Sequence, residues 1–206
     1  MKETLYSKRS NLIIGFHGCD RSVVDKVING KDNLIASTND YDWLGNGIYF
    51  WENNEERARA WAVQLSKRKN SSVKEPAVVG AIIDLGCCFD LTDNHYLNEL
   101  KEGYDALIKM CQEANIPLPQ NSIVGKSTDL LLRKLDCSVI QSIHRLHRQQ
   151  GNEPYDSVRG VFWEGNPVYP NAGFREKNHI QICVCNPNCI KGYFLPREID
   201  ENFPNP

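Results

Sequence analysis

Apolar residues along this chain recur with two different spacings. Short, continuous apolar runs bounded by glycine, proline or polar residues are typical of buried strands. The longest such run, AVVGAIIDL at residues 77–85, predicts a central strand. The other predicted strands are residues 12–16, 48–51, 157–163, 179–184 and 190–195.

Helical spacing marks the remaining segments. Asp20 carries the short acceptor side chain preferred at a helix N-cap and predicts a helix over residues 21–28. Either Asn53 or Asn54 is expected to cap the next helix, whose apolar face includes Trp61. Three further helices are predicted at residues 96–114, 127–135 and 139–149.

The order of these elements indicates the fold class. Strands lie at both ends of the chain, with a helical stretch at about residues 94–150 between them. Segregation of this kind favours an α+β fold over a parallel sheet with alternating helices. We therefore expect one domain over residues 1–206, with a mostly antiparallel core split into two sheets and residues 94–150 as a helical insertion.

Composition narrows the class of protein. Hydrophobic residues make up 41% and charged residues 24%, as in ordinary globular domains. The net charge of -2 argues against a strongly basic nucleic-acid binder, although the run IHRLHRQQ at 143–150 could form a local basic face. No apolar run approaches the roughly 18 residues of a membrane helix, and the first residues, MKETLYSKRSN, lack a secretory signal. We expect a cytoplasmic protein with no membrane partner.

The chain contains eight cysteines. An even number suits the disulfides of a small secreted domain, but this chain is longer and has no signal segment. A zinc site usually shows paired C-x-x-C motifs, and none is visible. We expect free, mostly buried thiols and no metal.

Two glycine-framed motifs stand at the ends of predicted strands. Gly15-Phe16-His17-Gly18-Cys19 places a histidine between small residues, and Leu44-Gly45-Asn46-Gly47-Ile48-Tyr49-Phe50 leads into an aromatic strand. Glycine lets the chain turn sharply and lets a flat ligand approach the backbone. Neither G-x-G-x-x-G after a strand nor a P-loop is present.

These motifs, with AVVGAIIDLGCCFDLTD, resemble the ADP-ribosyltransferase superfamily, in the branch of poly(ADP-ribose) polymerases and diphtheria toxin. The resemblance spans about residues 12–93 and implies the split two-sheet core of that fold. It implies that NAD is the substrate, with His17 bonding the adenosine ribose, the Gly18 backbone holding the carboxamide and Tyr49 stacking on nicotinamide. Ser37, Gly47 and Trp61 complete the implied dinucleotide contacts.

The family's last catalytic residue, usually glutamate, starts a late strand. The late strand here reads KNHIQICV, without glutamate, and alternation puts His179, Gln181 and Cys183 on one face. Some bacterial relatives carry glutamine there, so Gln181 is the expected third member of a His-Tyr-Gln set. The preceding loop contains Glu176.

The chemistry raises a question of charge. Release of nicotinamide passes through a transition state with oxocarbenium character, which a nearby carboxylate stabilises. Glutamine carries no charge, so Glu176 or Glu164 must supply it, or His179 acts as base toward the acceptor, or the protein is a slow enzyme or only a binder.

The resemblance implies transfer of ADP-ribose to a macromolecular acceptor, protein or nucleic acid. Free-standing domains of this kind resemble bacterial toxins or defence effectors, which can have a cognate antitoxin. Two alternatives remain open from the sequence: an NAD glycohydrolase, with water as acceptor, and a catalytically inactive module that binds NAD or ADP-ribose.

Overall fold

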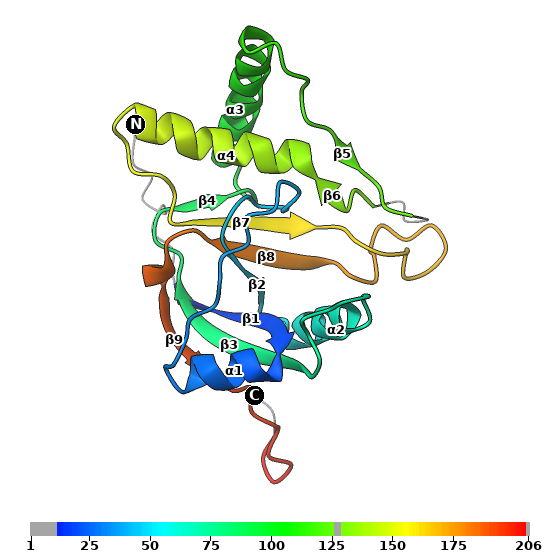
Figure 1. The fold of residues 1–206 in the computed structure, drawn as a ribbon. Coiled ribbons are helices and arrows are strands. Elements are labelled where there is room, and N and C mark those ends of the chain that lie inside the picture. Colours follow the sequence, from blue (N-terminus) through cyan, green and yellow to red (C-terminus); the bar gives the residue numbers. More distant parts are fainter. Residues whose placement is uncertain (1–11, 126–128, 205–206) are drawn as a thin grey trace.

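Seven strands form the central sheet of the protein. The computed structural model describes residues 12–125 and 129–204 (Figure 1). The strand order is β4-β7-β8-β2-β1-β3-β9, and every neighbouring pair is antiparallel except β4 and β7. These strands are β1 (Leu12–Asp20), β2 (Ile48–Glu52), β3 (Pro76–Asp84), β4 (Cys88–Asp90), β7 (Ser157–Phe162), β8 (His179–Val184) and β9 (Ile190–Phe194). The predicted α+β class with a mostly antiparallel sheet is confirmed.

The sheet is almost divided between β1 and β2. Only two residue pairs join these strands, Gly15 with Glu52 and Phe16 with Trp51. On its other side β1 pairs with β3 over nine residues. The halves expected as separate sheets therefore meet at one short join, with β1, β3 and β9 on one side of it and β2, β8, β7 and β4 on the other (Figure 1).

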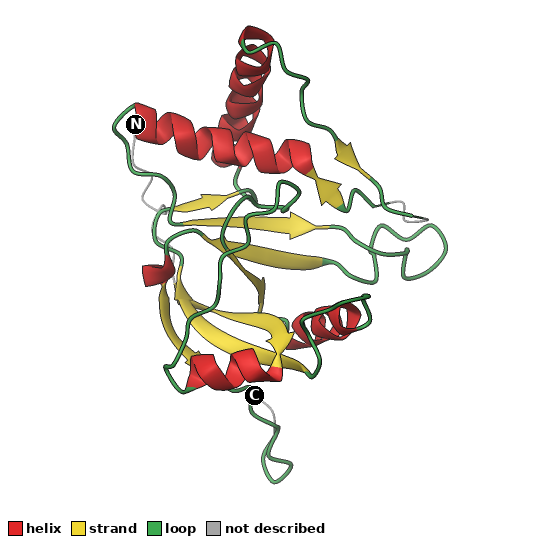
Figure 2. Ribbon diagram, viewed as in Figure 1, coloured by secondary structure: helices red, strands yellow, loops and turns green. Residues whose placement is uncertain are grey.

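Helices cover both faces of the sheet (Figure 2). Val24 and Val27 of α1 pack in the main core with residues from β1, β2, β3 and β8. Complete burial of one such side chain contributes about 1.5–3 kcal/mol. On the opposite face α2 covers β1 and β3, while α3 and α4 cover β7 and β8. The helices are α1 (Arg21–Ile28), α2 (Glu55–Ser66), α3 (Asn94–Glu113), α4 (Lys134–Gln149) and the short 3-10 turn η1 (Pro187–Cys189).

Both N-terminal helices begin at the predicted caps. The Asp20 carboxylate accepts from the backbone N–H of Ser22 at 3.0 Å, and also from the N–H groups of Lys74 and Glu75. Asp20 therefore caps α1 and ties it to the segment before β3. Of the two candidate asparagines for α2, Asn54 accepts from the Arg57 N–H at 2.9 Å.

The segment at residues 94–150 differs from the prediction of three helices. It holds α3 and α4, and between them a two-stranded sheet of β5 (Asn121–Ser122) and β6 (Leu132–Arg133). The helix predicted at 127–135 is wrong over residues 129–133, and residues 127–128 lie outside the described part. Asn121 explains the boundary, since its side-chain oxygen accepts from the Leu135 N–H at 2.9 Å and so caps α4 from a distant strand.

None of the helices in residues 12–125 and 129–204 is both long and apolar enough to cross a membrane.

Replacement of Gly18 by alanine tests the packing of α2 on β1. A Cβ at this position would lie 2.0 Å from the carbonyl oxygen of Ala58, so α2 must move away. Overpacking of this kind costs about 1–3 kcal/mol of stability. Urea unfolding measures the loss. Gly192→Ala on β9 is the matched control, because a Cβ there meets nothing within 4 Å; equal stability of the two variants would contradict this packing.

Candidate functional site

His17 lies where β1 and β2 part. Its Nδ1 is 2.7 Å from the carbonyl oxygen of Tyr49, so Nδ1–H donates and the imidazole bridges the two halves of the sheet. Burial lowers the pKa of His17, and the bond to Tyr49 offsets this only in part. A neutral imidazole that donates through Nδ1 has Nε2 free as an acceptor. His17 is therefore a neutral link across the join.

Tyr49 has its side chain on the other face of the sheet. Its hydroxyl accepts from the Leu44 N–H at 2.9 Å and donates to the Gly45 carbonyl at 2.6 Å. Burial raises the pKa of Tyr49 well above its usual value. The hydroxyl thus closes the turn at residues 44–49 and is fully engaged there.

The implied roles of His17 and Tyr49 as contacts of one NAD molecule need correction, because the two side chains do not face a common cleft. The His17 ring packs edge-on to Phe50, at 5.9 Å between ring centroids, on the face that α1 covers. Tyr49 belongs to the cluster under α4. Alternation along β2 separates the two side chains, because neighbouring strand residues point to opposite faces. They meet only through the His17 ring and the Tyr49 backbone.

Other parts of the chain occupy the space directly beside the two glycines that were expected to admit a ligand. Gly18 lies against Ala58 of α2. Gly47 lies against Cys183 and Val184, and its backbone exchanges two hydrogen bonds with Ser37, at 2.8 and 3.0 Å. Gly18 and Ser37 therefore hold elements together, and Gly47 does so too, although it also lines a cavity of about 690 Å³ on the face that α4 covers.

A cluster of polar groups lies at the start of β8, on the same sheet face as Tyr49. Four of the five buried side-chain nitrogen or oxygen atoms without a hydrogen-bond partner in the described residues come from this region. They are Trp51 Nε1, Arg57 Nε, Asn178 Oδ1 and His179 Nε2. Nearly all buried polar atoms in proteins have partners, so this concentration marks a candidate ligand site.

An ion pair closes one side of this cluster. The Arg57 guanidinium donates to the Glu164 carboxylate at 2.5 Å, and the two side chains are 10% and 11% exposed. Glu164 also has Lys177 at 3.6 Å. Since desolvated ions are costly to leave alone, Arg57 and Glu164 hold one another between α2 and the end of β7.

His179 is neutral in this setting. Burial lowers its pKa, although the bond that Nδ1–H donates to the Lys177 carbonyl at 2.6 Å raises it in part. Nε2 is therefore an acceptor, and it has no partner. Two of the unpartnered atoms are donors, from Trp51 and Arg57, and two are acceptors, from Asn178 and His179.

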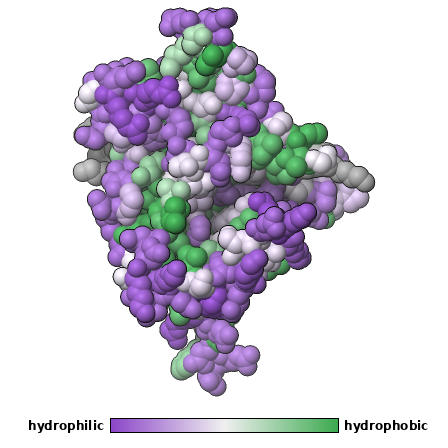
Figure 3. All heavy atoms as spheres, in the orientation of Figure 1, coloured by the Kyte–Doolittle hydropathy of each residue, from purple (hydrophilic) through white to green (hydrophobic). Residues whose placement is uncertain are grey.

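Aromatic rings surround these atoms. Trp51 lies 6.0 Å from Trp61 and 6.5 Å from His179, and His179 stacks on Trp43 at 6.2 Å. The Arg57 guanidinium lies 5.8 Å from the Trp51 ring. In the space-filling view the surface is hollowed between the half that carries β7 and β8 and the half that carries α2 (Figure 3).

The other predicted residues divide between this cluster and the surface. Gln181 pairs with Trp51 of β2 and Gly160 of β7, on the face that His179 shares. Glu176 is exposed and accepts from the backbone and side chain of Asn166, each at 3.3 Å. His179, Gln181 and Trp61 therefore gather near Trp51, and Glu176 supports a surface loop.

Sequence patterns did not single out Arg57 or Trp51. A signal existed for both: Arg57 stands four residues before Trp61 on α2, and Trp51 stands two after Tyr49 on β2. Either spacing puts the two residues on one face of their element.

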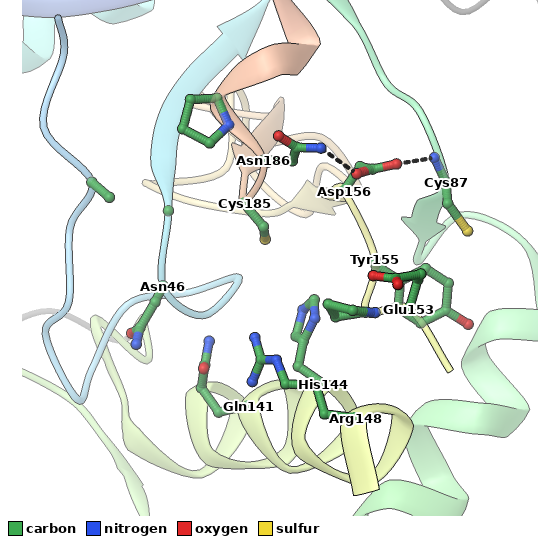
Figure 4. Close-up of a pocket in the computed structure, with 14 residues that line it drawn as sticks. Asn46, Cys87, Gln141, His144, Arg148, Glu153, Tyr155, Asp156, Cys185 and Asn186 are labelled. Atoms are coloured by element: carbon green, nitrogen blue, oxygen red, sulfur yellow. Dashed lines mark hydrogen bonds between the residues drawn. The ribbon is translucent and has the colours of Figure 1, made fainter. Parts of the chain in front are cut away.

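Two cavities lie on the same face, one away from the cluster and one beside it, where Trp43 and Phe162 pack near His179. One, of about 690 Å³, is lined by Cys185, His144 and residues around them (Figure 4). The other, of about 470 Å³, is a largely apolar groove that includes Trp43, Tyr104 and Phe162. Neither is lined by His17, Tyr49 or Gln181. Within the described residues no group of three or more His, Cys, Asp or Glu could hold a metal ion.

Comparison with known proteins finds an archaeal relative of this chain. The chain is 29% identical, over 208 aligned residues, to an uncharacterized protein of the archaeon Methanocaldococcus jannaschii. The alignment covers 90% of this chain and 89% of that protein. No family model matches the chain, and no solved structure matches it.

His17→Asn is expected to flatten the dependence of stability on pH below about 6.5, the pKa of a solvated imidazole. Burial holds the pKa of folded His17 below that value, so on acidification the unfolded chain takes up a proton before the folded chain does. The wild-type free energy of unfolding should be retained above about pH 6.5 and fall as pH drops below it. Asparagine keeps an N–H donor but binds no proton.

Urea unfolding between pH 7.5 and pH 5 measures this difference. His179, whose pKa burial also lowers, retains part of the slope in the variant. Parallel curves for wild type and variant would show that His17 titrates alike in the folded and unfolded chains.

Proposed function

We propose that the protein is an NAD-dependent ADP-ribosyltransferase, which cleaves the nicotinamide–ribose bond and transfers ADP-ribose to a macromolecular acceptor, protein or nucleic acid. The observation that carries the proposal is the cluster of unpartnered donors and acceptors at the start of β8. It adjoins the strand that contains the GIYF motif, and it lies at the start of the late strand, the position expected for the last catalytic residue of the family that the motifs resemble.

A nicotinamide ring fits the chemistry of this cluster. Its carboxamide offers one carbonyl acceptor and one NH₂ donor. Trp51 Nε1–H and Arg57 Nε–H are unused donors for the carbonyl, and Asn178 Oδ1 is an unused acceptor for the NH₂ group, which leaves His179 Nε2 available to the acceptor. The rings of Trp51 and Trp61 supply aromatic surfaces for a flat heterocycle.

Glu164 supports the proposal by supplying the missing negative charge. It lies next to the late strand that lacks a glutamate, it is buried, and its charge acts on His179. Glu176 is exposed and engaged with Asn166. A buried carboxylate stabilises an oxocarbenium-like centre more strongly than an exposed one, because solvent screens it less.

His179 suits the role of base toward the acceptor. Its neutral Nε2 can accept a proton from an attacking hydroxyl or water at neutral pH. His17, neutral and fixed on the Tyr49 carbonyl, keeps the two halves of the sheet in position beside the site.

Binding of NAD requires a local rearrangement. The four unpartnered atoms are shielded from solvent, so a ligand reaches them only when a covering group moves. The Arg57–Glu164 pair is the natural candidate, because movement of Arg57 would expose the Trp51 ring and free the carboxylate. The ligand then selects the open conformation.

The test of the proposed function is incubation of the pure protein with labelled NAD and whole-cell lysate. Labelled macromolecules support transfer. If only protease, or only nuclease, removes the label, the acceptor is a protein or a nucleic acid, respectively. Release of nicotinamide without labelled macromolecules identifies a glycohydrolase. Binding of NAD without cleavage indicates an inactive binding module, and no binding overturns the proposal.

Glu164→Gln is expected to lower kcat/KM for NAD cleavage by roughly 30- to 1000-fold, the equivalent of about 2–4 kcal/mol of transition-state stabilisation. Glu176→Gln is the matched control, because it removes the same carboxylate from an exposed position. This variant should retain activity. Titration of NAD against tryptophan fluorescence checks that the Glu164 variant still folds and binds. Equal loss in both variants, or in neither, would remove Glu164 from the mechanism.

A further inference from the structure

The cavity of about 690 Å³ lies at the far end of β8 from His179. Cys185, the first residue after β8, faces it from one side, and His144 of α4 faces it from the other (Figure 4). Gln141, one turn before His144, and Cys87 also line it. None of these residues belongs to the cluster around Trp51.

His144 is a buried group with an unused polar atom. Its side chain is 3% exposed, and Nε2 has no hydrogen-bond partner in the described residues. It is the fifth such atom, and it stands apart from the four at the start of β8. A desolvated imidazole nitrogen at a cavity wall, next to a thiol, is a common environment of a nucleophilic cysteine.

We propose that Cys185 is a site of reversible oxidation by hydrogen peroxide, in the cavity that it shares with His144. His144 acts on Cys185 as a positioning residue. This site is separate from the proposed NAD site and does not depend on it.

The oxidation step needs only a thiolate and the peroxide. The Cys185 sulfur attacks one peroxide oxygen, so that an S–O bond forms and the O–O bond breaks. The departing hydroxide takes up the proton that was released when the thiol ionised, and leaves as water. Sulfur loses two electrons to the peroxide, and the product is the sulfenic acid, which a thiol reductant returns to cysteine.

The surroundings of the sulfur favour the thiolate. The neighbouring Cys183 side chain is the largest influence that lowers the pKa of Cys185; burial opposes it, and His144 lowers the pKa further. The pKa of Cys87 is instead raised, by burial and by Asp156. Other titratable or charged groups that line the cavity are Arg148, Glu153, Tyr155 and Asp156.

Cys87 provides an internal control. It lines the same cavity and is exposed, whereas Cys185 is half-buried. Access alone would therefore make Cys87 the faster thiol to react, and ionisation alone would favour Cys185. The order of reaction separates the two explanations.

The experiment uses the full chain, reduced and then freed of reductant, with hydrogen peroxide at pH 6, 7 and 8. Catalase stops the reaction, and remaining thiols are alkylated and mapped by mass spectrometry, before and after dithiothreitol. This readout detects the sulfenic acid and any disulfide with Cys183 derived from it. Cys185→Ser and Cys87→Ser, each in turn, confirm the assignment.

Cys185 should be oxidised about tenfold faster than Cys87 at pH 6, because its much larger thiolate fraction outweighs the lower nucleophilicity of a low-pKa thiolate. Its rate should be nearly constant from pH 6 to pH 8, while that of Cys87 rises by about tenfold per pH unit. Equal rates at pH 6, a tenfold rise per unit for Cys185, or oxidation that dithiothreitol does not reverse would each overturn the proposal.

His144→Asn tests the positioning role. Loss of the imidazole should move the pH profile of Cys185 oxidation to higher pH and leave that of Cys87 unchanged. A purely structural contribution of His144 would change stability without moving the profile. Should this variant fail to fold, the wild-type pH profiles of the two cysteines decide on their own.

Discussion

The hydrogen bond from His17 to the Tyr49 carbonyl spans the weakest join of the sheet. β1 and β2 share two residue pairs, whereas β1 shares nine with β3 and β2 shares four with β8. Backbone groups beyond a short ladder need other partners when they are buried, and the imidazole supplies one at 2.7 Å. Backbone hydrogen bonds hold each half of the sheet together internally. Between the halves, the bond from His17 adds to only two residue pairs. A neutral ring is required, because burial disfavours its charged form.

Packing beside this join determines the polar cluster. Close contact of α2 with Gly18 sets the depth of that helix against β1, and α2 in turn carries Arg57 to Glu164. Trp51 continues β2 beyond Tyr49, and β8 brings Gln181 opposite to it. The unpartnered atoms of Trp51, Arg57, Asn178 and His179 thus come from three segments, β2, α2 and the start of β8, which converge beside this join. Such atoms cost free energy unless a ligand or water satisfies them, which is why they support a binding role.

A single strand links two chemically different regions. His179 opens β8 beside the ion pair, and Cys185 follows its last residue at the cavity under α4. Both side chains face the same side of the sheet, since odd-numbered residues alternate to one face. An unpartnered imidazole nitrogen lies at each end of the strand: Nε2 of His179 at its start, and Nε2 of His144 opposite Cys185. The strand therefore places the imidazole of His179 at one end and the thiol of Cys185 at the other.

Local patterns in the sequence predicted six strands of the central sheet and the cap at Asp20, because these depend on periodicity and on contacts within a few residues. The antiparallel class followed from the order of strands and helices along the chain, and the choice of Asn54 over Asn53 as the cap of α2 came from the structure. The β5–β6 pair escaped prediction because each strand is only two residues long, too short for a periodic pattern, and because Asn121 of β5 bonds to the start of α4, more than ten residues away. Strand alternation correctly put His179, Gln181 and Cys183 on one face of β8. It could not show that His17 and Tyr49 point to opposite faces, because this depends on how β1 and β2 join, which only the tertiary structure decides. The meeting of Arg57 with Glu164, 107 residues apart, and of Cys185 with His144 is likewise tertiary, because no local pattern encodes which distant charges share a buried space.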